Sequence, residues 1–257
     1  MLTAEELKQL VKQSRTAPFS VLREYYQTLF LSYLSQNPHN SHLIFKGGTC
    51  IRLLYQGNRF SEDLDFTVTD LNEVEAAQAI ETIVTAMSKE TNVKFKPVKS
   101  IAGRCFKITF ITPLHPQPIV IKIDLSFRDF LGIVESTAIQ TRYPILFNQL
   151  IYHYPKEAIL AEKVHAINHR TKGRDLYDIW FLISMLTPIN HNLINKKLSF
   201  FKETFNQAQF TNRIIKFPLD SFVSDLNPFI NDDERSRLKE IHQVITTTLP
   251  SRLTQQP

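Results

Sequence analysis

The sequence predicts an α+β protein, with a mixed β-sheet core and flanking helices followed by a helical C-terminal region. Three observations predict it. Short apolar or alternating segments of strand length are confined to the first half of the chain. Helical periodicity separates those segments and dominates after about residue 130. No flexible linker divides the chain, so we expect two closely packed parts: a core with N-terminal helices over 1–130 and a helical region over 131–257 that completes the functional site.

The first half predicts helices and strands in alternation. We expect helices over 4–13, 18–36, 49–55 and 72–89, and strands over 43–46, 63–68, 93–98, 105–111 and 119–127. Asn37-Pro38 ends the second helix, and the prolines between 113 and 118 mark the turn before the last strand. After residue 130 the helix candidates are 157–170, 175–185, 190–205 and 232–248.

The composition is that of an ordinary globular protein. Hydrophobic residues make up 43% of the 257 and charged residues 21%, both near the average for such proteins. No apolar run reaches the roughly 18 residues that cross a membrane, and the N-terminal segment lacks the layout of a signal peptide. We therefore expect no membrane partner and a cytoplasmic location. The formal net charge of +5 is compatible with a nucleic-acid partner without specifying one.

Cysteine and histidine spacing gives no zinc motif. Cys50 and Cys105 are the only cysteines, which excludes a disulfide framework and, without a CxxC pair, argues against structural zinc. His165 and His169 have the i, i+4 spacing of zinc ligands on a helix. The acid of an HExxH motif is missing between them, so we do not expect a metal there.

Gly47-Gly48-Thr49 follows a predicted strand and opens a predicted helix. A glycine pair by itself often makes only a turn. In this position the glycines let backbone N–H groups approach phosphate oxygens at a helix N-terminus. The spacing matches neither a Walker A motif nor GxGxxG. We therefore expect a phosphate-binding loop that belongs to neither of those classes.

Asp63 and Asp65 alternate on the next predicted strand and so share one face of it. Alternating acids usually form a solvated face, but Leu64 and Phe66 make the opposite face apolar, so this strand covers a core. Two carboxylates this close repel each other unless a cation neutralises them. Mg²⁺ prefers such oxygen ligands. A phosphate loop beside a metal-binding acid pair predicts nucleotidyl transfer.

Asp124 is the third candidate acid. It lies on the strand IVIKIDLSF, sharing one face with Lys122 while the other face is apolar. A single strand aspartate is more often structural. Beside the first two acids it would complete a two-metal site or help to deprotonate an attacking hydroxyl.

Lys163 and Asp175 have ordinary interpretations from spacing alone. Lys163 lies at the margin of an apolar helix surface, where a surface lysine is the default and a phosphate contact the alternative. Asp175 falls in the first turn of a predicted helix, where acids commonly act as caps or partners of the helix dipole. The basic residues before it could be solvated or could contact a polynucleotide.

The order KGGT, RFSEDLDF, KIDLSF and ILAEKVHAINHRTKGRDLYDIWFL resembles the AbiEii/AbiGii toxin family of bacterial nucleotidyltransferases over roughly residues 15 to 190. The resemblance implies a nucleotidyltransferase-fold core with a helical C-terminal region. It also implies a toxin of a toxin–antitoxin or phage-abortive system with a cognate antitoxin, and transfer of nucleotides from NTPs, in some relatives to the 3′ end of tRNA.

The resemblance also implies roles for individual residues. Gly47, Gly48 and Thr49 correspond to the phosphate loop, with Arg59 and Ser61 as further motif residues whose roles stay open. The metal residues are Asp63, Asp65 and Asp124, Lys163 reaches the nucleotide, and Asp175 is the acid of the last motif. No motif falls after residue 190.

Three functions fit these residues. The first is Mg²⁺-dependent transfer of a nucleoside monophosphate from an NTP to RNA, with tRNA as the favoured acceptor. The second keeps the enzyme and changes the acceptor to a protein hydroxyl. The third is a non-catalytic protein that binds nucleotide or RNA, whose signature would be a degenerate site. All three acids are intact, which favours an enzyme.

Overall fold

A computed structural model describes residues 1–99 and 103–255 and confirms the predicted α+β fold with a mixed sheet. By contacts between residues the chain divides into two compact units, Met1–His153 and Tyr154–Pro257. The sequence analysis placed the division at residues 130/131. The sheet extends past that point, because two short strands at 135–137 and 151–153 join it.

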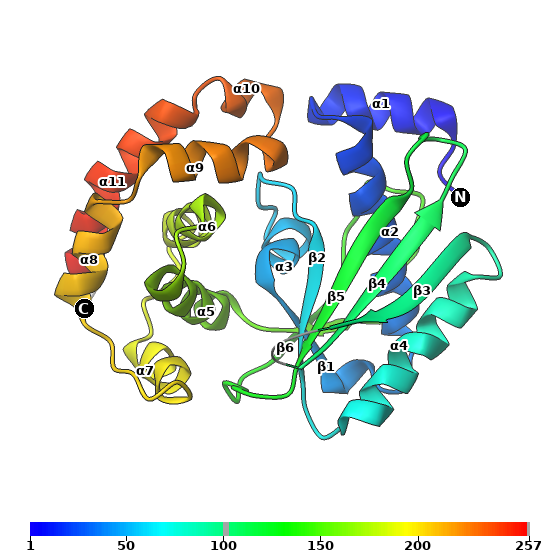
Figure 1. The fold of residues 1–257 in the computed structure, drawn as a ribbon, viewed down its shortest axis with the longest axis horizontal. Coiled ribbons are helices and arrows are strands. Elements are labelled where there is room, and N and C mark those ends of the chain that lie inside the picture. Colours follow the sequence, from blue (N-terminus) through cyan, green and yellow to red (C-terminus); the bar gives the residue numbers. More distant parts are fainter. Residues whose placement is uncertain (100–102, 256–257) are drawn as a thin grey trace. The chain divides into compact units, whose positions relative to one another are not determined.

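Seven strands form one sheet in the N-terminal unit, in the order β3-β4-β5-β2-β1-β7-β6 (Figure 1). The strands are β1 (Leu43–Lys46), β2 (Asp63–Val68), β3 (Asn92–Val98), β4 (Arg104–Ile111), β5 (Ile119–Ser126), β6 (Glu135–Thr137) and β7 (Ile151–His153). The β2–β5 and β1–β7 pairs are parallel, and the other neighbours are antiparallel. The first five strands match the predicted segments to within one residue at each end.

Four α-helices and one 3-10 turn accompany this sheet within the described part of the N-terminal unit. They are α1 (Ala4–Ser14), α2 (Pro18–Ser35), η1 (Asn40–His42), α3 (Gly47–Leu54) and α4 (Glu73–Met87). Capping boxes formed by Thr3 with Glu6, and by Asn72 with Glu75, fix the starts of α1 and α4. The helices α2 and α4 contact each other and strands of the sheet (Figure 1), so they bury its apolar side chains.

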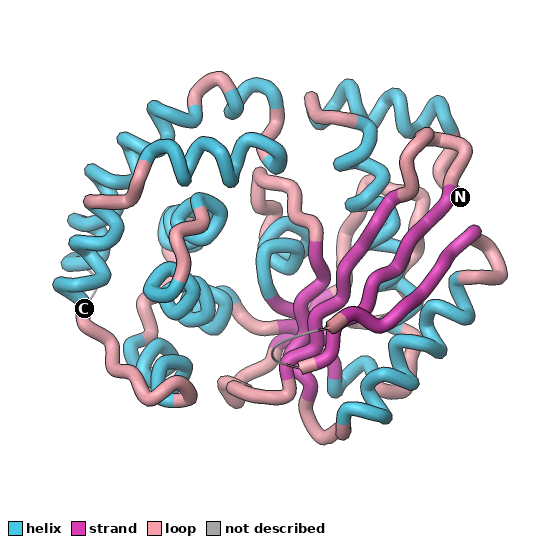
Figure 2. Tube along the Cα trace, viewed as in Figure 1, coloured by secondary structure: helices cyan, strands magenta, loops and turns pink. Residues whose placement is uncertain are grey.

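The C-terminal unit is helical throughout its described residues (Figure 2). Its helices are α5 (Lys156–His169), α6 (Gly173–Ser184), α7 (His191–Ser199), α8 (Gln207–Ile215), α9 (Leu219–Leu226), η2 (Asn227–Phe229), α10 (Asp232–Arg235) and α11 (Leu238–Gln255). Gly173 is needed at the start of α6, because a Cβ there would lie 2.6 Å from the backbone oxygen of Phe222 in α9. None of the helices in the described residues is long and apolar enough to cross a membrane.

Two helix predictions in this unit were wrong in extent. The segment 190–205 is not one helix, because α7 closes at Ser199 with a Schellman motif. The N–H of Glu203 donates to the carbonyl of Leu198 (3.1 Å), that of Lys202 donates to Ser199 (3.0 Å), and Lys202 adopts a left-handed φ of 60°. The segment 232–248 is interrupted between α10 and α11, and α11 continues to Gln255.

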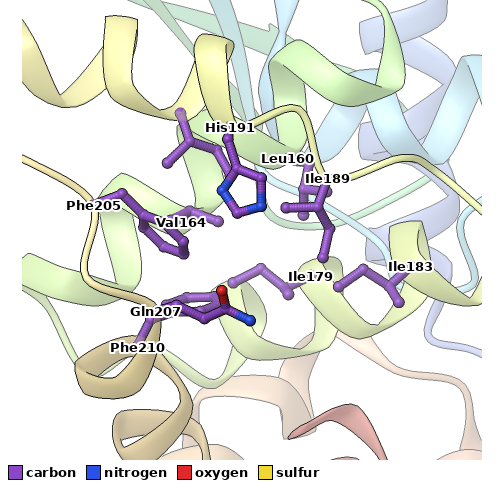
Figure 3. A pocket seen from close by; sticks show the side chains of 10 residues that line it. Leu160, Val164, Ile179, Ile183, Ile189, His191, Phe205, Gln207 and Phe210 are labelled. Atoms are coloured by element: carbon purple, nitrogen blue, oxygen red, sulfur yellow. The ribbon is translucent and has the colours of Figure 1, made fainter. Parts of the chain in front are cut away.

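The core of the C-terminal unit encloses one small apolar pocket of about 10 Å³ (Figure 3). Its walls include Leu160, Val164, Ile179 and Phe210. A space of this size holds at most one water molecule. This pocket is therefore a packing gap and not a nucleotide site.

Candidate active site

The parallel pairing of β2 with β5 brings the three predicted metal residues together. The two strands lie side by side (Figure 1), and in their register Asp65 is the partner of Asp124 and Asp63 is the partner of Lys122. Neighbouring strands lie about 4.8 Å apart, and alternate residues of one strand lie about 6.6 Å apart. The carboxylates therefore start from adjacent backbone positions on one face of the sheet. A separation of over a nanometre between Asp124 and the other two is excluded.

The opposite face of the same two strands is buried. Leu64, Phe66, Ile123 and Leu125 are at most 1% exposed, which holds both strands on the core. Because side chains alternate along a strand, this burial fixes the acids on the other side. The apolar residues between the acids therefore determine where the carboxylates point.

The charged side chains of this cluster shift one another's pKa values. Burial, together with the charges of Asp65 and Asp124, raises the pKa of Asp63 to about 6. Lys122 places its Nζ 2.5 Å from Oδ2 of Asp124. Burial alone would lower the pKa of Lys122, but the hydrogen bond and charge of Asp124 and the charge of Asp63 raise it. The site thus combines the carboxylates of Asp63, Asp65 and Asp124 with the ammonium of Lys122, and carboxylates this close together favour a bound cation.

Gly47 and Gly48 pack against this cluster from the start of α3. Gly47 has φ +79°, and a Cβ on it would collide with the carboxylate of Asp65. A Cβ on Gly48 would collide with the guanidinium of Arg59 and lie 3.0 Å from the hydroxyl of Ser61. Only a chain without side chains at both positions can pass so close to these groups.

One further contact ties the loop to β2, and another holds the Arg59 side chain. The hydroxyl of Thr49 donates a hydrogen bond to the carbonyl of Asp63. Arg59 is 4% exposed and donates from Nη1 to the carbonyl of Phe60 (3.0 Å). All the residues that the sequence analysis assigned to the phosphate loop and to metal binding therefore gather at one place in the N-terminal unit.

Lys163 and Asp175 form a second cluster, inside the C-terminal unit. The Nζ of Lys163 lies 3.0 Å from Oδ1 of Asp175 and 2.7 Å from Oδ2 of Asp178. Arg170 grips Asp175 in bidentate fashion, with Nε 2.6 Å from Oδ2 and Nη2 3.0 Å from Oδ1. The Lys163 side chain is 10% exposed and both aspartates are 1% exposed.

This arrangement replaces both ordinary interpretations of these residues. Lys163 is buried, so it is not a surface lysine. The carboxylate of Asp175 binds two cations of α5 and its C-terminal end, so it is an ion-pair partner and not a simple helix cap. Burial alone would raise the pKa of Asp175, but the charges and hydrogen bonds of Lys163 and Arg170 hold it well below its ordinary value.

The sequence analysis missed the partners in both clusters. Lys122 was noted only for sharing a face with Asp124, yet that i, i+2 spacing is what lets the two side chains meet. Asp178 stands three positions after Asp175, and on a helix these two side chains share one face. The basic residues Lys172 and Arg174 pair with Asp225, at 3.7 and 3.3 Å.

The sequence matches the family described as "Nucleotidyl transferase AbiEii toxin, Type IV TA system" over residues 29–250. The chain belongs to the AbiEii family. It is therefore a nucleotidyltransferase of a toxin family, as the resemblance predicted. No curated protein matches it in sequence.

Solved structures share the AbiEii-family fold of this chain. MenT4, a nucleotidyltransferase toxin from Mycobacterium tuberculosis H37Rv, aligns with a TM-score of 0.62 at 17% identity, covering 100% of this chain and 91% of MenT4. JHP933 from Helicobacter pylori aligns with a TM-score of 0.50 at 19% identity, covering 92% of this chain and 96% of its own. At such identities the likeness establishes the fold.

Proposed function

We propose that this AbiEii-family protein transfers a nucleoside monophosphate from an NTP to an RNA acceptor, the 3′ end of tRNA, with Mg²⁺ as cofactor. The observation that carries the proposal is the packing of three strand carboxylates against a glycine loop that begins a helix. The attacking hydroxyl would approach the α-phosphate in line, and pyrophosphate would leave.

The carboxylates of Asp63, Asp65 and Asp124 fit Mg²⁺, because they are hard oxygen ligands that lie close together on one face of the sheet. Bound there, the metal would supply charge neutralisation for the phosphates and for the attacking and leaving oxygens. Asp124 would bind a second metal ion or accept the proton of the attacking hydroxyl, with Lys122 orienting its carboxylate.

The glycine loop would bind the NTP phosphates. Backbone N–H groups at the start of α3 carry the positive end of the helix dipole and suit phosphate oxygens. Arg59 and Ser61, which lie against Gly48, add a guanidinium and a hydroxyl beside the same backbone. Thr49, bound to the carbonyl of Asp63, would hold the loop in register with the acids.

Lys163 would contact the nucleotide as a point charge. Asp175 and Asp178 then act as positioning residues, because their carboxylates fix the Lys163 ammonium. Arg170 completes the charge balance around Asp175.

A groove in the C-terminal unit supports RNA as the acceptor. The basic groove, as we call it, has a volume of about 700 Å³, and its walls include Lys202, Arg213, Lys216, Gln209 and Asn212. Lysine and arginine supply phosphate contacts, and the amides supply further hydrogen bonds to RNA. The net charge of the chain, +5, is positive like the groove and so also favours a polyanion such as RNA. With tRNA as the acceptor, the reaction would take place in the cytoplasm, opposed by the antitoxin that the family description implies.

Incubation of the purified protein with Mg²⁺, total tRNA and each of four labelled NTPs tests this function. We expect label at tRNA 3′ ends, lost with EDTA and reduced about 100-fold or more in Asp65→Asn. Glu240→Gln, at an exposed ion pair on α11, is the matched control and should keep full transfer.

The same assay separates the acceptors. Label that survives RNase and is lost with protease would overturn the tRNA acceptor and favour a protein hydroxyl. Full transfer by Asp65→Asn would overturn the assigned metal site.

A further inference from the structure

The C-terminal unit contains a second candidate metal centre, whose ligand types differ from those of the carboxylate cluster. His165 and His169 of α5 and Glu203, just after α7, each offer one ligand atom, and these atoms lie within 4.8 Å of one another. We propose that His165, His169 and Glu203 bind a zinc ion. No part of the proposed transfer reaction assigns a role to these three side chains.

The His169–Glu203 contact is already compatible with a shared ion. The ring Nε2 lies 3.0 Å from Oε1 and 3.1 Å from Oε2 of Glu203. As a simple pair this contact needs a proton on the ring. Two ligands about 2.1 Å from one tetrahedral zinc ion are about 3.4 Å apart, so a small adjustment lets the metal take the place of the proton.

His165 supplies the independent observation. Its Nε2 is buried, and within residues 1–99 and 103–255 it has no hydrogen-bond partner. Such buried nitrogens normally have one, and an ion is one of the groups that satisfies them. The ring stacks on Phe201 at 4.0 Å between centroids and lies 4.5 Å from the His169 ring.

Glu203 is held in place by the end of α7. The Schellman motif binds the Glu203 N–H to Leu198, and Lys202 turns the chain through its left-handed conformation. The backbone conformation therefore places the Glu203 carboxylate beside the imidazole rings of His165 and His169. The third ligand atom thus comes from a residue 34 positions after His169, so no local motif around the two histidines predicts it.

The donor set selects the metal. Two imidazoles and one carboxylate suit zinc, whereas Mg²⁺ prefers oxygen ligands alone. The His169 and Glu203 side chains are 47% and 34% exposed and also line the basic groove. Three protein ligands leave one position for water, which is the composition of an accessible site and not of a closed structural one.

Zinc titration of the full chain in saturating Mg²⁺ tests the proposal. We expect one zinc ion per chain, bound with micromolar or tighter affinity, together with a rise in Tm that EDTA reverses. Co²⁺ in place of zinc should give the visible absorption of a tetrahedral imidazole-bound ion. The excess of Mg²⁺ is there to compete with zinc at the carboxylate cluster.

Variants decide whether these residues are the ligands. Glu203→Gln and His169→Gln should each weaken zinc binding at least tenfold and abolish the cobalt spectrum, with circular dichroism unchanged. His39→Ala, at a histidine of the N-terminal unit, is the control and should bind zinc like the wild type. Unchanged zinc affinity in Glu203→Gln and His169→Gln, or affinity weaker than micromolar in the wild type, would show that His169 and Glu203 form only an ion pair.

Discussion

Asp63 is a side chain whose ionised form is disfavoured by its surroundings in the folded protein. Its carboxylate is partly buried beside two other acids, and its pKa rises from 3.8 to about 6. The folded state therefore holds this proton more tightly than the unfolded chain does. Stability contributed by the neutral form is lost as pH rises from about 4 to 6, and the loss is complete above that range.

Asp63→Asn should therefore stabilise the protein at pH 7.5 without divalent cations. We expect a gain of about 1–2 kcal/mol in the free energy of unfolding, after allowance for solvent screening of this partly exposed group. The gain should vanish near pH 4, where the aspartate is already protonated. Urea unfolding at the two pH values measures it.

Magnesium provides the control for this prediction. Mg²⁺ should raise the Tm of the wild type and have a smaller effect on Asp63→Asn, because the variant lacks one ligand and the repulsion that the metal relieves. A variant less stable than the wild type at pH 7.5 would contradict the raised pKa.

At the scale of elements, ion pairs hold α5 to α6. Lys163 of α5 is the shared cation between Asp175 and Asp178 of α6. Removing one member of a buried ionic cluster lowers the stability of the fold by far more than the intact cluster adds to it. The reason is that the remaining charges are left buried without a partner.

Lys163→Met should destabilise the protein by about 3–5 kcal/mol, since it leaves two buried carboxylates without their shared cation. The lowered pKa of Asp175 means that its stabilisation is fully present above the ordinary carboxyl pKa of 3.8 and is lost as pH falls below it. The stability difference between wild type and variant should therefore be largest at pH 7 and shrink below pH 4. Thermal unfolding across this range measures it.

Lys196→Met, at an exposed lysine of α7, is the matched control and should change stability by less than about 0.5 kcal/mol. A Lys163→Met protein as stable as this control would show that the cluster is not maintained in solution.

The elements that could be predicted are those whose periodicity is unambiguous. The strands carrying Asp63, Asp65 and Asp124 alternate strictly with buried residues, so both the strands and the direction of the acids could be read from sequence. The short strands β6 and β7 were not predicted, because three residues cannot show a periodic pattern. Their pairing is decided by tertiary contacts. The short helices α8 and α9 were not predicted, because each has only two buried residues to mark its apolar face.

Contacts between elements were the harder part of the site. Lys163 and Asp175 were selected by family resemblance, while their spacing pointed to a surface lysine and a helix cap. Their pairing depends on how α5 packs on α6, and no local pattern encodes that packing. For the same reason, the sequence could not predict that Glu203 lies beside His165 and His169 of α5.

On the scale of the whole molecule, charge should govern RNA binding. A protein that neutralises phosphates with lysine and arginine releases counterions, so its affinity falls steeply with salt. The basic groove contributes Lys202, Arg213 and Lys216 to such contacts in the proposed complex.

Arg213→Ala and Lys216→Ala should each weaken tRNA binding and reduce the slope of log K against log salt by about 0.7–0.9. Fluorescence anisotropy at a series of salt concentrations gives both values. Lys239→Ala, at an exposed lysine of α11, is the control. Slopes equal to that of the control would place the RNA elsewhere on the protein.

The parallel pairing of β2 with β5 has a consequence for the cell that makes this toxin. β3, β4 and β5 form an antiparallel series of sequence neighbours, whereas the β2–β5 pairing joins segments far apart in the chain, and such non-local contacts form slowly. Until that pairing is made, Asp124 is not beside Asp65. A nascent chain from which β5 has not yet emerged from the ribosome therefore cannot assemble the three-carboxylate cluster.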